Sequence, residues 1–93
     1  MDKQAIKEKA FKYYGPAIQF RKLQEECGEL VAAISRYMNN PTTVGFLNVI
    51  EETVDVKIVS EQFFENHYNH AMVKEFENMK LERLEGWIND AER

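Results

Sequence analysis

Two pairs of acidic residues are the side chains of this sequence best suited to chemistry. Glu26 and Glu29 form one pair, and Glu52 and Asp55 form the other. The i, i+3 spacing places both members of a pair on one face of a helix, one turn apart. A buried carboxylate is costly unless a cation or a donor neutralises it. Two such pairs facing each other would form an oxygen-rich cage for Mg²⁺, or alternatively Mn²⁺.

The spacing alone is not specific, because a third acidic pair, Glu82 and Glu85, shares it. Lys80 and Arg83 alternate with that pair, which is typical of a solvated helix face. Glu52 instead lies within an apolar surface, a poor place for a carboxylate without a partner. Its context favours a functional role for the first two pairs.

Helices must position these pairs, since no stretch shows strand alternation. Turn signals occur at Gly15-Pro16 and around Asn39-Asn40-Pro41. They divide the chain into four predicted helices, at about 2–13, 16–38, 46–67 and 70–91. The predicted fold class is therefore all-α and four-helix-bundle-like, in one domain over 1–93, with a basic N-terminal helix at 1–14 and a catalytic helical core at 16–92.

The predicted second and third helices carry different apolar patterns. The stripe on the second helix predicts a face toward the core, and it consists of Leu23, Cys27, Leu30, Val31 and Ile34. The third helix is apolar nearly all round, which is typical of a helix buried on all sides. In 93 residues this predicts packing against a second copy, as a homodimer or homotetramer.

Composition excludes several classes of protein. The net charge of −4 argues against a general nucleic-acid binder, although residues 1–22 hold six Lys/Arg against two Asp/Glu. No apolar run is long enough to cross a membrane, and Lys residues interrupt any signal-like segment at the N-terminus. The single cysteine, Cys27, fits a reducing cytoplasmic compartment and is expected to be a small buried side chain.

Other metal and nucleophile chemistries lack their residues. A di-iron bundle needs Glu-x-x-His pairs, but no acidic residue stands three positions before His67 or His70. One cysteine is too few for a zinc site, and the four glycines are too isolated for a phosphate-binding loop. The acidic pairs remain the strongest candidates.

The order and spacing of the acidic pairs resemble the MazG-like superfamily of all-α nucleoside triphosphate pyrophosphohydrolases. Members carry Glu-Glu-x-x-Glu followed by Glu-x-x-Asp, and this chain has Glu25-Glu26-Cys27-Gly28-Glu29 and Glu52-Thr53-Val54-Asp55. The separation of 22 residues between Glu29 and Glu52 is inside the family range. The tail, Lys80-Leu81-Glu82-Arg83-Leu84, is similar to the basic last helix of small phage and bacterial members. It departs from them at Gly86-Trp87, where members often have a further basic residue.

The resemblance implies a Mg²⁺-dependent enzyme that cleaves nucleoside triphosphates into a monophosphate and pyrophosphate, by water attack at the α-phosphorus. The implied metal ligands are Glu26, Glu29, Glu52 and Asp55. Glu25, beside them, would orient or deprotonate the water, or would be an ordinary exposed residue. The implied substrate-binding residues are Lys80 and Arg83 for the β- and γ-phosphates, with Lys22 and Asn48 as further candidates.

Three alternatives stay open. One is a related enzyme, such as a dimeric dUTPase-like or phosphoribosyl-ATP pyrophosphohydrolase. Another is a non-catalytic helical interaction module, in which the acidic pairs are only charged faces. The last is a degenerate relative that binds nucleotide without cleaving it, which the complete set of four acids disfavours.

Overall fold

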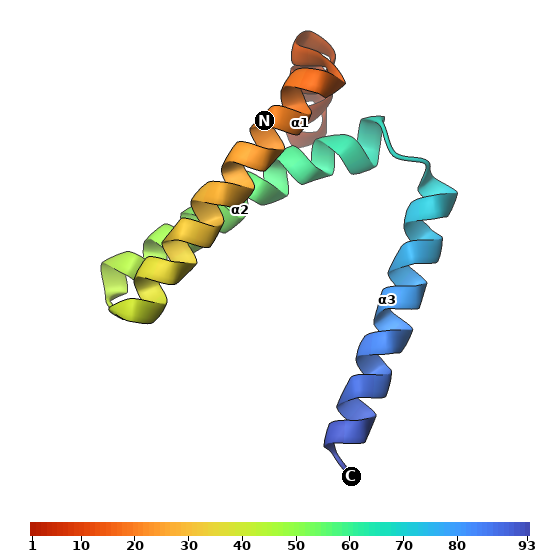
Figure 1. The fold of residues 1–93 in the computed structure, drawn as a ribbon. Helices are drawn as coiled ribbons and strands as arrows, with labels where there is room; N and C mark the ends of the chain where they lie inside the picture. Colours follow the sequence, from red (N-terminus) through yellow and green to blue (C-terminus); the bar gives the residue numbers. More distant parts are fainter.

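The computed structural model describes all residues, 1–93, and contains three helices and no strand (Figure 1). Helix α1 spans Lys3–Asn39, α2 spans Thr43–Asn66 and α3 spans His70–Ala91. The predicted all-α class is confirmed. No helix is both long enough and apolar enough to cross a bilayer.

Each helix begins at a side chain that caps it. Asp2, Thr42 and Asn69 accept hydrogen bonds from backbone N–H groups three residues ahead, at 3.0, 3.0 and 3.1 Å. Such caps satisfy amides that have no partner within the helix. The cap at Thr42 starts α2 at Thr43, three residues before the predicted boundary, whereas α3 begins where the sequence predicts.

The first two predicted helices form one element with a kink at Gly15. Its dihedral angles, φ 83° and ψ 164°, are non-helical and are accessible essentially only to glycine. Pro16 follows, in the position where proline starts a helix well. Two helical segments therefore lie on either side of the kink in α1, as the Gly15-Pro16 signal predicts, and α2 and α3 make four.

Helices α1 and α2 form an antiparallel hairpin, and the small core lies at its kinked end. Phe63 is fully buried and packs with Phe11 and Val59. The Phe63 ring lies edge-on to Phe11, with ring centroids 5.3 Å apart, and stacks on Phe20 at 4.2 Å. These aromatic contacts hold the N-terminal segment of α1 against the end of α2.

Two polar contacts fix the same hairpin. The Gln19 amide nitrogen donates to the Gln62 oxygen at 2.7 Å, and both side chains are buried. Lys7 joins the N-terminal segment to α2 through Glu61 at 3.2 Å and Glu65 at 2.9 Å. The basic N-terminal helix thus has a structural role.

The predicted core-facing stripe of α1 is wrong in its orientation. Leu23 and Leu30 are half-buried, but Cys27 is exposed, and Val31 and Ile34 are 64% and 43% exposed. The α1 face that meets α2 instead carries the three buried side chains Gln19, Glu26 and Ala33. Their seven-residue spacing follows the seam of two packed helices. The expectation of a buried Cys27 is wrong for the same reason: Cys27 belongs to the stripe, which lies beside the α1–α2 contact and not in it.

Helix α3 extends away from the hairpin and has no buried residue (Figure 1). Only α1 and α2 pack against each other along their length. The radius of gyration is 16.5 Å, against about 12–13 Å for a compact domain of this length. A single chain therefore does not form a closed four-helix bundle.

Candidate metal centre

The hairpin brings together three carboxylates from the two acidic pairs. Glu26 comes from α1, and Glu52 and Asp55 come from α2; one oxygen of each lies within 4.8 Å of the others. Glu26 is only 6% exposed, and the two α2 residues are half-buried. The three side chains converge because the two helices pack antiparallel. Glu26 is one of the buried positions where α1 meets α2. Glu52 and Asp55 lie one turn apart on the same side of α2.

Two oxygens in this cluster lack any partner. Glu26 Oε2 and Glu52 Oε2 are buried and accept no hydrogen bond. Buried polar atoms are normally paired, so such atoms require an explanation. Carboxylate oxygens without donors fit a hard cation with oxygen ligands, such as Mg²⁺. The donor set thus fits the implied metal.

Lys22 supplies the only positive charge that contacts the cluster. Its Nζ lies 2.9 Å from Glu26 Oε1 and 3.9 Å from Glu25 Oε1. The hydrogen bond to Glu26 raises the pKa of Lys22, assisted by the charges of Glu26 and Glu25. Lys22 therefore remains charged and neutralises one face of Glu26, while Glu26 Oε2 stays free on the other. Glu25 itself is exposed.

Glu29 lies at the exposed rim and is not among the three converging acids. The negative charge of Glu26 raises the pKa of Glu29, and desolvation and the charge of Glu52 raise it further. Glu29 is therefore close enough to interact electrostatically with acids of both helices, Glu26 on α1 and Glu52 on α2. The raised pKa indicates an excess of negative charge that a cation would relieve.

The predicted substrate-binding residues are dispersed. Asn48 is half-buried one turn before Glu52 and lines a polar cavity with Arg36 and Glu51, beside the loop that joins α1 to α2. Lys80 and Arg83 lie on α3, which does not pack on the hairpin. Within one chain the structure does not bring these two cations to the carboxylates.

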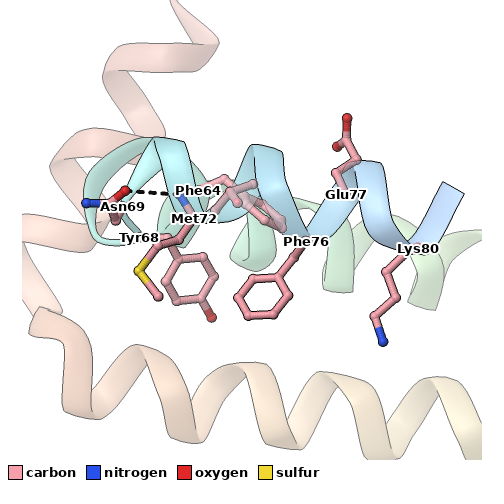
Figure 2. Close-up of a pocket in the computed structure, with 8 residues that line it drawn as sticks. Phe64, Tyr68, Asn69, Met72, Phe76, Glu77 and Lys80 are labelled. Carbon is pink, nitrogen blue, oxygen red and sulfur yellow. Dashed lines mark hydrogen bonds between the residues drawn. The ribbon is translucent and has the colours of Figure 1, made fainter. Parts of the chain in front are cut away.

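Lys80 instead borders an apolar groove of about 470 Å³ where α2 meets α3 (Figure 2). The groove is formed by Phe64, Tyr68, Asn69, Met72, Val73, Phe76, Glu77 and Lys80. Figure 2 shows Tyr68, Phe76 and Lys80 pointing to the same side, while Glu77 points away. The guanidinium of Arg83 lies 5.0 Å from the centre of the Trp87 ring, a cation–π distance.

Sequence reasoning missed the Gln19–Gln62 hydrogen bond. Gln19 precedes Glu26 by seven residues, and Gln62 follows Asp55 by seven. That shared spacing, two turns along the same seam, is the signal that could have identified the pair.

Comparisons with protein-family models, with characterised proteins and with solved structures found no match to this chain.

Proposed function

We propose that this chain is a Mg²⁺-dependent nucleoside triphosphate pyrophosphohydrolase that acts as a homo-oligomer. The observation that carries the proposal is the convergence of Glu26, Glu52 and Asp55 with two buried, unpaired carboxylate oxygens. Their order and spacing in the sequence match the MazG-like pattern, which supplies the reaction class.

Glu26, Glu52 and Asp55 would bind the ion from the seam, and Glu29 from the rim. Bound Mg²⁺ would polarise the phosphate oxygens, promote ionisation of a water and offset charge on the leaving pyrophosphate. Lys22 Nζ lies 2.9 Å from Glu26 Oε1, which would leave the unpaired Oε2 available to the ion.

Hydrolysis forms a bond from the water oxygen to the α-phosphorus and breaks the bond to the oxygen bridging to the β-phosphate. Glu25 is exposed beside the cluster, and in this proposal its carboxylate accepts the proton of the attacking water. Pyrophosphate leaves with the bridging oxygen, and a nucleoside monophosphate remains. Asn48, one turn before Glu52, would contact the sugar or a metal-bound water.

The test is pyrophosphate release from a panel of canonical, deoxy and damaged nucleoside triphosphates, in Mg²⁺ and in EDTA. The proposal expects Mg²⁺-dependent release that Glu52→Gln abolishes. Glu75→Gln is the matched control, since Glu75 is an exposed acid outside both the cluster and the cavity that Asn48 lines. The panel and phosphoribosyl-ATP would also separate the related dUTPase-like and phosphoribosyl-ATP activities.

A second candidate is a helical interaction module without catalysis. The observation that favours it is the extent of exposed apolar surface on α2 and α3, including Ile50, Val54 and Phe76 at 44–55% exposure. This candidate expects no turnover of any triphosphate and no stabilisation by Mg²⁺.

A further inference from the structure

Lys22 interacts with three acids from one position on α1. Its Nζ lies 2.9 Å from Glu26 Oε1 and 3.9 Å from Glu25 Oε1. The hydrogen bond to Glu26 raises the pKa of Lys22 most, and the charges of Glu26, Glu25 and Glu29 raise it further. These acids all belong to the first acidic motif, Glu25-Glu26-Cys27-Gly28-Glu29. Lys22 is therefore the cation that the chain itself provides to the α1 side of the cluster.

The two oxygens of Glu26 have different surroundings. Oε1 contacts the Lys22 ammonium group, whereas Oε2 is buried and has no hydrogen-bond partner. The residue is only 6% exposed, so little water reaches its carboxylate. Glu26 also converges with Glu52 and Asp55, one oxygen of each lying within 4.8 Å of the others. The Glu26 carboxylate thus has two cation positions: Lys22 fills one, and the ion of the proposed function would fill the other.

This arrangement has the form of a two-ion site. Enzymes that hydrolyse phosphate compounds often hold two divalent ions about 3.5–4 Å apart. At that separation one carboxylate can ligate both ions, one through each oxygen. Glu26 is placed as such a bridging carboxylate, but one of its cations is an ammonium group. An ammonium group neutralises a carboxylate and donates hydrogen bonds, yet it has no coordination position for a water.

The surroundings of Lys22 would suit a metal ion if the ammonium group were absent. Glu25 and Glu29 carry negative charge beside Glu26 Oε1, and neither is among the three converging acids. Removal of the ammonium group would leave carboxylate oxygens next to a bridging carboxylate, and these are the ligands that Mg²⁺ and Mn²⁺ prefer. The Lys22 side chain is 46% exposed, so an ion could reach this position from solvent.

We infer that Lys22 takes the place of a second metal ion, so that the nucleotide-free protein binds one divalent ion per chain. The inference rests on the proposed function, which supplies the first ion. Lys22 is then a positioning residue, because it holds Glu26 and compensates its charge, and it affects the reaction through Glu26. This role differs from direct contact with the phosphates.

Counting bound ions tests the substitution. Mn²⁺ is titrated into nucleotide-free protein, and electron paramagnetic resonance measures the free ion. We expect one bound ion per chain in wild type, two in Lys22→Met, and one in Lys22→Arg, which restores a cation. Lys12→Met is the matched control and should bind one, because Lys12 pairs at 2.8 Å with Glu8, four residues away, outside the cluster. A second ion in wild type or Lys22→Arg, or a single ion in Lys22→Met, would overturn the inference.

Urea unfolding in EDTA tests the charge compensation without any metal. Lys22→Met should lower the urea midpoint, because Glu26 is left buried without a cation. Adding Glu26→Gln to Lys22→Met should restore at least half of the loss, because the uncompensated charge is removed. Lys12→Met should have less than half the effect, since the side chains of Lys12 and Glu8 are 73% and 48% exposed. An unchanged midpoint in Lys22→Met, or no recovery with Glu26→Gln, would refute the role of Lys22.

The two measurements distinguish this inference from the proposed function. If wild type binds one ion and releases pyrophosphate while Lys22→Met also binds one ion, the function stands and the substitution is refuted. If wild type binds no Mn²⁺ and releases no pyrophosphate, the proposed function fails and the substitution fails with it. Recovery of the urea midpoint by Glu26→Gln would still establish Lys22 as the counter-charge of Glu26 in that case.

Discussion

Replacing Glu52 by Gln should stabilise the metal-free protein and remove its stabilisation by Mg²⁺. Glu52 has a buried, unpaired oxygen and lies in a cluster with Glu26 and Asp55. In the absence of metal these carboxylates repel each other. The substitution removes one charge, keeps the shape of the side chain and replaces one acceptor oxygen by an NH2 donor.

The magnitude follows from the geometry. Two unit charges 4.8 Å apart repel by about 3.5 kcal/mol at an effective dielectric constant of about 20. Glu52 is half-exposed and Lys22 offsets part of the charge of Glu26, so screening leaves about 1 kcal/mol. That difference corresponds to a rise in Tm of about 4–8 °C for a domain of this size. Mg²⁺ at 100 times its Kd should add about 2.7 kcal/mol to the wild type alone.

The assay is thermal unfolding at fixed protein concentration and matched ionic strength, in EDTA and across a Mg²⁺ titration. Glu51→Gln, an exposed change on the same helix, should keep the wild-type response to Mg²⁺. The order of stabilities should invert, with Glu52→Gln above wild type in EDTA and below it in Mg²⁺. A wild-type Tm that Mg²⁺ leaves unmoved, or a Mg²⁺ response retained by Glu52→Gln, would refute the reasoning.

Three further predictions concern stability. Phe63→Ala should cost about 3–5 kcal/mol in urea unfolding, since Phe63 is fully buried, and clearly more than Phe64→Ala at a side chain 46% exposed; similar costs would contradict the assigned core. Gly15→Ala should cost about 1–3 kcal/mol in the same assay, because its φ of 83° strains any other residue although space is open; an unchanged midpoint would argue against the kink. The pKa of Glu29 is raised mainly by the charge of Glu26, so protonation of Glu29 stabilises the folded state. In EDTA, Tm should therefore rise as the pH falls through the raised pKa toward the ordinary value of 4.5, and Glu29→Gln should flatten the rise.

Local signals in the sequence predicted the helices well and their packing less well. The break between the first two long helices lies where it was predicted, although α2 starts three residues before its predicted boundary, and α3 occupies the predicted range. The kink at Gly15 was visible as a Gly-Pro pair. The orientation of α1 was not, because its sequence has two candidate faces and periodicity favours the more apolar one. In the structure the face with Glu26 and Ala33 meets α2, and the more apolar stripe is half-buried or exposed.

The acidic cluster was predictable because the members of each pair are close in sequence on one helix. Packing of α1 against α2 is then the only further step that joins Glu26 to Glu52 and Asp55. The placement of Lys80 and Arg83 could not be predicted, because it depends on the direction that α3 takes after the turn that follows α2. Helical periodicity carries no information on that angle. Lys22 was expected only as a further substrate-binding candidate. Its ion pair with Glu26 at 2.9 Å was not predicted, although the one-turn spacing of the two residues was the signal for it.

The buried hydrogen bond between Gln19 and Gln62 bears on how uniquely the hairpin is specified. Two apolar helices can slide past each other by a turn and still bury similar area, whereas an amide pair is satisfied in one alignment only. The alignment that joins these amides is also the one that brings Glu26 opposite Glu52 and Asp55. Replacing both glutamines by leucine should thus allow more than one register of the two helices, even if the hairpin becomes more stable. The Gln19–Gln62 pair therefore fixes the register of the two helices, and with it the distance between the carboxylates of Glu26, Glu52 and Asp55 two turns away.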